Sequence, residues 1–232
     1  MINKSQTIKL WASSVFRIVF FSAVLLWPAG TLFWWDAWVL IVLWTAYGFF
    51  MTVYLLQYDP DLLKERLKFV PIHKDQKAWD KVLMLLFFVA GIGLYLLPGF
   101  DVVRFGWSEP LALWMRVTAM LIHIPCFISL GWVMRENTYL SQVVKIDKAR
   151  NHQVISTGPY ALVRHPMYTI VIIMLFAMPI ALGSRYALIL SVFLSVLLIV
   201  RTYLEERTLM EELTGYAEYT EKVRYRLIPG VW

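Results

Sequence analysis

Apolar stretches near twenty residues recur along the whole chain, and each is about long enough to cross a hydrocarbon layer of roughly 30 Å as an α-helix. Six of them stand out, at about residues 14–29, 35–56, 82–97, 111–134, 169–182 and 186–204. Only 16% of the 232 residues are charged, whereas about 25% is usual in a soluble domain. The sequence therefore predicts an all-α, polytopic transmembrane helix bundle that forms a single integral membrane domain.

The number of full spans stays open at five or six. The fifth segment has about fourteen residues and contains Pro179, and a helix of that length covers only about 21 Å. A tight turn at Gly183 and Ser184 predicts that the fifth and sixth segments form a helical hairpin, which crosses the membrane fully or in part. The first segment lacks a small-residue cleavage site before Pro28, so we interpret it as a retained span.

Basic residues are distributed unevenly among the loops. The connections at 28–36, 98–110 and 183–185 hold only Arg104 and Arg185, and the other loops and both ends of the chain hold almost all the remaining lysines and arginines. The positive-inside rule then predicts that both termini and residues 57–81 and 135–166 are cytoplasmic. Tryptophans gather near the opposite surface, as interfacial residues do: Trp27, Trp34, Trp35, Trp38 and Trp107.

The net charge of +6 does not indicate nucleic acid, because the basic residues flank apolar spans, where they set topology and contact anionic membrane lipids. The single cysteine, Cys126, lies in an apolar segment, which excludes a disulfide framework and a cysteine metal site. The sequence lacks both the His-Glu-x-x-His spacing of zinc hydrolases and the Gly-x-Ser-x-Gly elbow of serine hydrolases. We therefore expect no metal.

Two of the stretches expected on the cytoplasmic side are long enough to be structured. Residues 57–81 predict an amphipathic interfacial helix that begins at Asp59-Pro60-Asp61 and carries Leu62, Leu63, Leu67 and Phe69 among charges. Residues 135–168 lack an apolar stripe and concentrate polar and aromatic side chains. We therefore divide the chain into a four-helix membrane scaffold, residues 1–134, and a region that carries the chemistry, residues 135–232.

The densest group of reactive side chains is the run Gly158-Pro159-Tyr160-Ala161-Leu162-Val163-Arg164-His165-Pro166-Met167-Tyr168, directly before an apolar segment. Pro166 suits a first helical turn and disfavours helical dihedrals at His165. Arg164 and His165 are thus expected just outside a helix N-terminus, which suits a carboxylate or another polar ligand. The alternative is a membrane-entry loop in which Arg164 meets lipid phosphate and Tyr160 and Tyr168 are interfacial anchors.

A second group lies at the end of the last apolar segment. Arg201 and Glu205 are four residues apart and so share a helix face, where they either pair or converge on one ligand. Ionisable groups so close to the hydrocarbon are costly, which favours a polar cavity. The alternative is a snorkelling salt bridge.

These motifs, with the ending Gly215-Tyr216-x-x-Tyr219 and Arg224-Tyr225-Arg226-Leu227-Ile228-Pro229-Gly230-Val231-Trp232, resemble the isoprenylcysteine carboxyl methyltransferase and phospholipid methyltransferase family over about residues 134–232. The resemblance implies a membrane-embedded pocket for S-adenosyl-L-methionine, formed on the cytoplasmic side by the C-terminal third. It also implies two catalytic residues: Glu205 holds the cofactor's amino group, and Arg201 faces the methyl acceptor. The cofactor-binding residues that it implies are His152, Gln153, Val154, Ile155, Tyr160, Arg164, His165, Pro166, Met167, Tyr168 and Glu205.

The expected activity is methyl transfer from S-adenosyl-L-methionine to a lipidic or hydrophobic acceptor, in the manner of a carboxyl-O-methyltransferase. A prenylcysteine carboxylate, a lipid amine and a small thiol all fit a pocket that opens to the membrane, so the acceptor stays open. One position departs from the family pattern. The family's enzyme on prenylated proteins has a cofactor-contacting glutamine where this chain has Lys145, and Gln142 is the neighbour that would substitute.

Three functions from other classes compete. A membrane reductase that uses NADPH is the nearest, since its C-terminal helices would be similar to those of sterol reductases. A transporter would place ionisable groups on several spans, yet the first four segments carry few beyond Arg17, Arg116 and His123, and His123 is expected to be buried and hydrogen-bonded. A purely structural membrane protein would leave the cluster from Arg164 to Tyr168 unexplained.

Overall fold

The computed structural model describes residues 4–67, 76–144 and 152–232, and within these ranges the chain is helical, with no β-strand. The helices are α1 (Lys4–Ala29), α2 (Trp35–Tyr58), α3 (Pro60–Arg66), α4 (Ala78–Pro98), α5 (Leu113–Glu136), α6 (Pro166–Ala181), α7 (Ala187–Glu212) and α8 (Tyr216–Lys222). A π-helix (Gly99–Arg104) continues α4, and a 3₁₀-helix (Gly158–Ala161) precedes α6. The predicted all-α class is confirmed, and each apolar segment of the sequence is a helix.

Among the residues that the structure describes, four helices are long and apolar enough to cross a membrane: α2, α4 with its π-helical extension, α5 and α7. The apolar part of α1, Ser14–Ala29, and the whole of α6 are shorter. The chain is thus a multi-pass membrane protein. The fifth segment is short, as its sequence indicated, and the count of five or six full spans stays a prediction.

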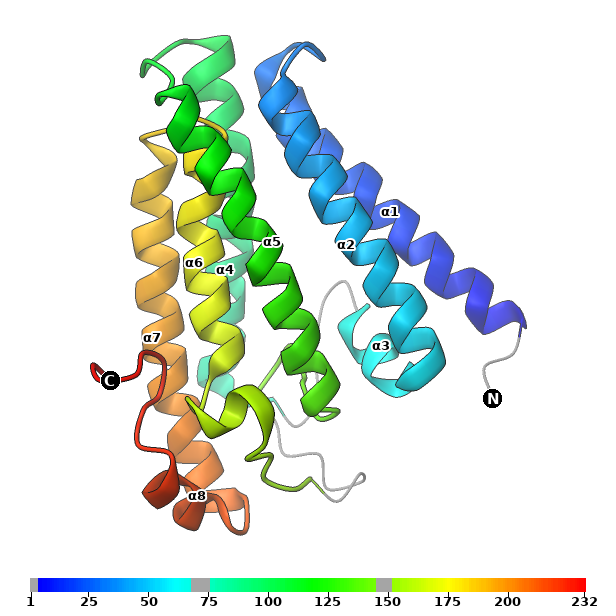
Figure 1. The fold of residues 1–232 in the computed structure, drawn as a ribbon. Coiled ribbons are helices and arrows are strands. Elements are labelled where there is room, and N and C mark those ends of the chain that lie inside the picture. The colour runs from blue at the N-terminus through cyan, green and yellow to red at the C-terminus, as the bar shows by residue number, and fades with distance from the viewer. Residues whose placement is uncertain (1–3, 68–75, 145–151) are drawn as a thin grey trace.

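Helices α4, α5, α6 and α7 form a bundle, and α1 and α2 form a hairpin beside it (Figure 1). The hairpin lies close to the bundle at one end and diverges from it toward the other end, where both chain termini, α3 and α8 lie (Figure 1). All the loops expected in the cytoplasm that the structure describes therefore share one end of the molecule. Which side of a membrane that end faces stays a prediction.

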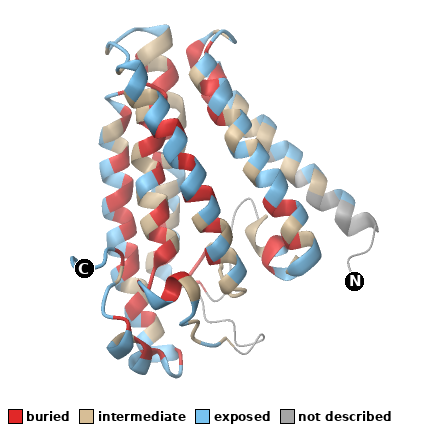
Figure 2. Cartoon of the chain, viewed as in Figure 1, coloured by how far each residue is buried: buried red, intermediate tan, exposed pale blue. Residues whose placement is uncertain are grey.

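Buried residues line the inner faces of the bundle, whereas much of the outer surface is exposed (Figure 2). Large apolar side chains on that surface, such as Val42, Leu85 and Ile128, are 62–70% exposed. In lipid such exposure costs nothing, so helices associate through close packing of small residues instead. Ala181 and Ala187, at the α6–α7 turn, are completely buried, as this rule leads one to expect.

The connection between α4 and α5 differs from the loop that the sequence indicated, since it begins with the π-helix. A Cβ atom at Gly99 would lie only 2.8 Å from the backbone nitrogen of Ala29, so only glycine lets the end of α1 approach so closely. Asp101 in this π-helix is completely buried. Its carboxylate accepts hydrogen bonds from the hydroxyls of Ser108, at 2.8 Å, and Ser184, at 2.6 Å.

Helix α3 begins where the sequence predicted. The Asp59 side chain accepts a hydrogen bond from the Leu62 N–H at 3.0 Å, and Pro60 occupies the first turn. Leu62 and Leu63 are buried against α2, which confirms an amphipathic helix over Pro60–Arg66. Phe69, assigned to the same helix, lies outside the described residues.

Asp101→Ala is expected to lower the free energy of unfolding by about 2 kcal/mol or more, because the buried Ser184 hydroxyl and the partly buried Ser108 hydroxyl lose their charged acceptor. Thermal unfolding in detergent, followed by tryptophan fluorescence, measures the effect. Glu109→Ala is the matched control, since Glu109 is an exposed acid on the same connection. Equal shifts in the two variants would contradict a structural role for Asp101.

Candidate active site

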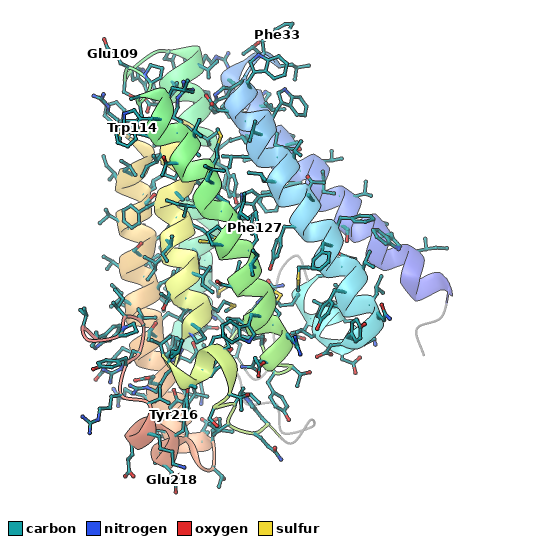
Figure 3. All side chains as sticks on the ribbon, in the orientation of Figure 1. Phe33, Glu109, Trp114, Phe127, Tyr216 and Glu218 are labelled. Carbon is teal, nitrogen blue, oxygen red and sulfur yellow. The ribbon has the colours of Figure 1, made fainter. Side chains whose placement is uncertain are left out.

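A pocket opens at the end of the bundle that carries α8. Its wall is formed by residues from 137–144, which follow α5, by residues 152–155, by the 3₁₀-helix, by the loop and first turn of α6, by the end of α7 and by α8. Tyr216 of α8 is labelled in Figure 3. All the residues that the resemblance assigned to the cofactor lie in this wall, although four separate stretches of sequence supply them. The lining residues are Asn137, Tyr139, Leu140, Ser141, Val143, Val144, His152, Gln153, Val154, Ile155, Tyr160, Arg164, His165, Pro166, Met167, Tyr168, Glu205, Leu209, Leu213, Tyr216 and Tyr219.

The 3₁₀-helix is positioned by a glycine that has no substitute. Gly158 has φ +57°, and a Cβ there would lie 2.6 Å from the Glu136 side chain and 3.0 Å from the Trp132 indole nitrogen. This approach brings Tyr160 into the wall, where its hydroxyl accepts a hydrogen bond from Asn137 at 2.9 Å. Burial raises the pKa of Tyr160, so its hydroxyl stays protonated at neutral pH.

Arg164 is committed to protein partners. Its guanidinium pairs with Glu206 through two nitrogens and donates through a third to the carbonyls of Val223, at 2.6 Å, and Arg224, at 2.9 Å. Burial opposes its charge, but the Glu206 carboxylate raises the pKa of Arg164. Four of its five N–H groups therefore bind protein acceptors. Arg164 forms part of the pocket wall, and its direct contact with the cofactor stays a prediction.

Glu206 also fastens the C-terminal tail. It pairs with Arg226, and its carboxylate oxygen lies 3.4 Å from Nε2 of His165. The backbone N–H groups of Arg164 and His165 donate to the carbonyls of Tyr225 and Arg226, both at 2.9 Å. The loop before α6 and the tail are thus held together along both backbone and side chains.

Glu205, the neighbour of Glu206, faces the pocket. One of its oxygens accepts a hydrogen bond from the Tyr168 hydroxyl at 2.6 Å, and no cation of the described residues forms an ion pair with it. The rings of His165 and Tyr168 are stacked, with centroids 5.6 Å apart and an interplanar angle of 6°. Tyr168 therefore orients a carboxylate that is left available to a positively charged ligand.

Arg201 does not pair with Glu205 and does not line the pocket. Its Nε donates to Asp80 at 2.9 Å, its Nη2 donates to the Gln142 carbonyl at 2.8 Å, and its guanidinium lies 5.6 Å from the centre of the Tyr168 ring. The predicted alternative of a simple salt bridge between Arg201 and Glu205 is thus wrong. Arg201 lies behind the pocket wall. Asp80, which the sequence interpretation missed, had one signal: it is an acid two residues before an apolar segment.

Gln142 cannot take the role suggested for it. Its side-chain amide donates to the backbone carbonyls of Glu65, at 3.2 Å, and Arg66, at 2.7 Å, and it is absent from the pocket wall. Those two bonds use both N–H donors of the Gln142 side chain, and their acceptors are carbonyls at the end of α3. Lys145, the other candidate at this position, lies outside the described residues.

Two tyrosines of α8 belong to the pocket although no role was predicted for them. The Tyr219 hydroxyl donates to the Tyr160 carbonyl at 2.7 Å. The Tyr216 hydroxyl is buried and has no hydrogen-bond partner among the residues that the structure describes. Burial raises the pKa of Tyr216, so this hydroxyl remains a donor. The motif from Gly215 to Tyr219 was visible in the sequence, but its place in the pocket was not.

His123 is confirmed as a buried, hydrogen-bonded histidine, because its Nδ1 lies 2.8 Å from the Ala119 carbonyl oxygen. Within the described ranges, no three histidine, cysteine, aspartate or glutamate side chains gather into a possible metal site.

Comparison with protein families matches residues 117–211 to the isoprenylcysteine carboxyl methyltransferase (ICMT) family. No curated protein matches the chain. The matched stretch begins in α5 and ends in α7, so it includes the predicted cofactor-binding residues and Arg201, but neither Asp80 nor α8. Over residues 117–211, this multi-pass membrane protein is therefore similar to the isoprenylcysteine carboxyl methyltransferase family, whose description is that of a methyltransferase.

Proposed function

We propose that the protein transfers a methyl group from S-adenosyl-L-methionine to a carboxylate on a lipidic acceptor, at the cytoplasmic face of the membrane. The observation that carries the proposal is the convergence of four separate stretches of sequence on one pocket, with Glu205 in its wall. The family description names a carboxyl group on an isoprenylated cysteine, and this chemistry is the one we assign to the acceptor. Neither the reductase nor the transporter interpretation finds support in the family match.

The pocket wall fits S-adenosyl-L-methionine. The Glu205 carboxylate, oriented by Tyr168, suits the ammonium group of the methionine part. The N-terminus of α6 at Pro166 also lies in the wall, and helix N-termini favour carboxylates. Ile155, Leu209 and Leu213 offer an apolar surface for the adenine ring, and the Tyr216 hydroxyl offers an unused donor.

The chemistry asks the protein mainly to position its reactants. When bound, S-adenosyl-L-methionine would supply a methyl group attached to a positively charged sulfur. The bond between sulfur and methyl breaks as the acceptor oxygen takes the methyl group, and the sulfur becomes a neutral thioether. A carboxylate acceptor is already ionised at neutral pH, so no residue has to remove a proton. The protein therefore has to orient the reactants and exclude water. The C-terminal tail that Glu206 holds beside the pocket contributes to both tasks, together with the buried Tyr216 and Tyr219.

Glu205→Gln is expected to weaken S-adenosyl-L-methionine binding by about 10- to 100-fold, because a neutral amide replaces the carboxylate opposite an ammonium. Calorimetry of the purified protein with S-adenosyl-L-methionine, S-adenosyl-L-homocysteine and NADPH tests the cofactor and the variant together. Glu211→Gln, an exposed acid on the same helix, serves as the control. Binding of NADPH alone, or equal affinities in both variants, would refute this assignment.

Arg201 and Asp80 are expected to act as a unit. Arg201→Ala alone should destabilise the protein by about 3–5 kcal/mol, since it leaves Asp80 buried without its cation. The double variant Asp80→Asn, Arg201→Gln should recover much of the stability and keep S-adenosyl-L-homocysteine affinity. It should nevertheless methylate N-acetyl-S-farnesylcysteine at least about tenfold more slowly, because the guanidinium that supports the Tyr168 ring of the pocket wall is gone. Turnover that recovers along with stability would reduce Arg201 to a structural role.

The topology is open to direct labelling. With Cys126→Ser as background, Lys64→Cys in α3 and Glu218→Cys in α8 should react with an impermeant maleimide only from the cytoplasmic side. Glu109→Cys should react only from the other side, since Glu109 and Glu218 lie at opposite ends of the molecule (Figure 3). The expectation rests on the skew of basic residues among the loops, and labelling of residue 218 in sealed, right-side-out cells would overturn it.

A further inference from the structure

The C-terminal tail, residues 223–232, turns back from α8 along the bundle (Figure 1) and is bonded to both sides of a stretch that lines the pocket. Ahead of that stretch, the backbone N–H groups of Arg164 and His165 donate to tail carbonyls, both at 2.9 Å. Behind it, the Thr169 hydroxyl donates to the Leu227 carbonyl at 2.7 Å. Between these bonds lie the residues by which the start of α6 contributes to the pocket wall. The tail therefore fixes the position of this part of the wall.

Side chains of the tail extend the contact to Tyr168. Leu227 is buried in a cluster with Tyr168 of α6 and Leu198 of α7, and Trp232 packs against the same cluster. The Tyr168 hydroxyl donates to Glu205 at 2.6 Å. Tyr168 thus joins the tail to Glu205, so a shift of the cluster would reach the carboxylate that we assign to the cofactor.

Trp232 closes the tail into a compact loop. Its backbone oxygen accepts hydrogen bonds from three successive N–H groups, those of Arg226, Leu227 and Ile228, at 2.9, 3.0 and 3.2 Å. Its ring lies 5.0 Å from the Arg226 guanidinium, within the limit of about 6 Å that is usual for a cation–π contact. Arg226 also pairs with Glu206. Trp232 therefore holds the tail together with the cation by which the tail binds α7.

An interfacial anchor is the alternative role for Trp232, because tryptophan is common at membrane surfaces and this one is partly exposed. Such an anchor needs an indole at the level of the lipid head groups, but no particular partner within the protein. Trp232 has several partners: the Arg226 guanidinium next to its ring, the three N–H groups on its oxygen, and the Tyr168 cluster. These contacts favour a role inside the protein.

We infer that Trp232 is a positioning residue for the cofactor site, on which it acts through the tail and Tyr168. The inference rests on the proposed function, in which Glu205 binds the ammonium group of S-adenosyl-L-methionine. A Tyr168 side chain held in one orientation places the Glu205 carboxylate before the ligand arrives, so binding loses less free energy to ordering the site. The whole tail lies outside the family-matched stretch, and the match therefore assigns it no role.

The test compares Trp232→Leu, which keeps an apolar side chain, with Trp232→Phe, which also keeps an aromatic ring. Val231→Ala is the matched control, because it shortens a side chain of the same tail that is 76% exposed. Calorimetry of the whole protein in detergent measures the affinity for S-adenosyl-L-homocysteine. Hydrogen exchange at the backbone amides of Arg164 and His165, followed by mass spectrometry without ligand, reports how firmly the tail holds the loop. This second measurement does not depend on the proposed function.

Trp232→Leu should bind S-adenosyl-L-homocysteine about three- to tenfold more weakly, because the cation–π contact that fixes Arg226 is lost. It should also exchange the amides of Arg164 and His165 at least about fivefold faster. Trp232→Phe should recover most of both losses, because a phenyl ring still faces the guanidinium. Val231→Ala should behave like the wild-type protein in both measurements.

A double-mutant cycle tests the path through Tyr168. Tyr168→Phe removes the hydrogen bond to Glu205. Adding Trp232→Leu to Tyr168→Phe should then weaken S-adenosyl-L-homocysteine binding by less than about twofold more, because the group on which Trp232 acts is already gone. Effects that add in full would be independent, and Trp232 would then have no role in positioning Glu205.

Unchanged affinity and unchanged exchange in Trp232→Leu would overturn the inference, as would equal losses in Val231→Ala. A wild-type protein that does not bind S-adenosyl-L-homocysteine would instead refute the proposed methyl transfer. The exchange measurement would still decide whether Trp232 holds the loop before α6. The two failures are therefore distinguishable.

Discussion

The carboxylate of Glu206 organises the end of the molecule that carries the pocket. It is buried near the end of α7 and takes part in ion pairs with Arg164 and Arg226, with His165 alongside. A buried carboxylate that loses its cations is strongly destabilising, so the loop before α6 and the C-terminal tail must reach Glu206 together. Successive residues on an α-helix point about 100° apart, which lets Glu205 face the pocket while Glu206 binds the tail. One helix thus supplies both the ligand contact and the clamp.

A second buried ion pair joins the two halves of the chain. Asp80 at the start of α4 holds Arg201 in α7 and also accepts from the Gln76 amide and the Val144 N–H, at 2.9 and 3.0 Å. Such a pair contributes little net stability when the cost of desolvation is counted, but it penalises any arrangement that separates its members. The membrane scaffold is therefore coupled to the pocket wall through Asp80, a residue outside the family-matched stretch.

The architecture suits a reaction between partners of opposite solubility. The outer faces of the helices expose apolar side chains, whereas the pocket lies at the end of the bundle where α8 lies, and α3 lies at the same end of the molecule (Figure 1). A polar cofactor and a lipidic acceptor would approach such a site from different media. Tyr168, which contacts both Glu205 and Arg201, links the pocket wall to the buried pair of Arg201 and Asp80 behind it.

The sequence by itself determined the helices, the short fifth segment, the turn at Gly183 and the start of α3, because length, apolar composition and capping residues act over one or two helical turns. Motif resemblance also named about half of the residues that line the pocket, but not Tyr216 and Tyr219. Only the tertiary structure decided which ionisable groups meet. Arg201 pairs with Asp80, 121 residues away, and not with Glu205, four residues away, and Arg164 pairs with Glu206, 42 residues away. The spacing of charges along one helix shows which pairs are near, but a buried charge takes the partner that folding brings into its low-dielectric surroundings, and that choice is made by the packing of distant helices.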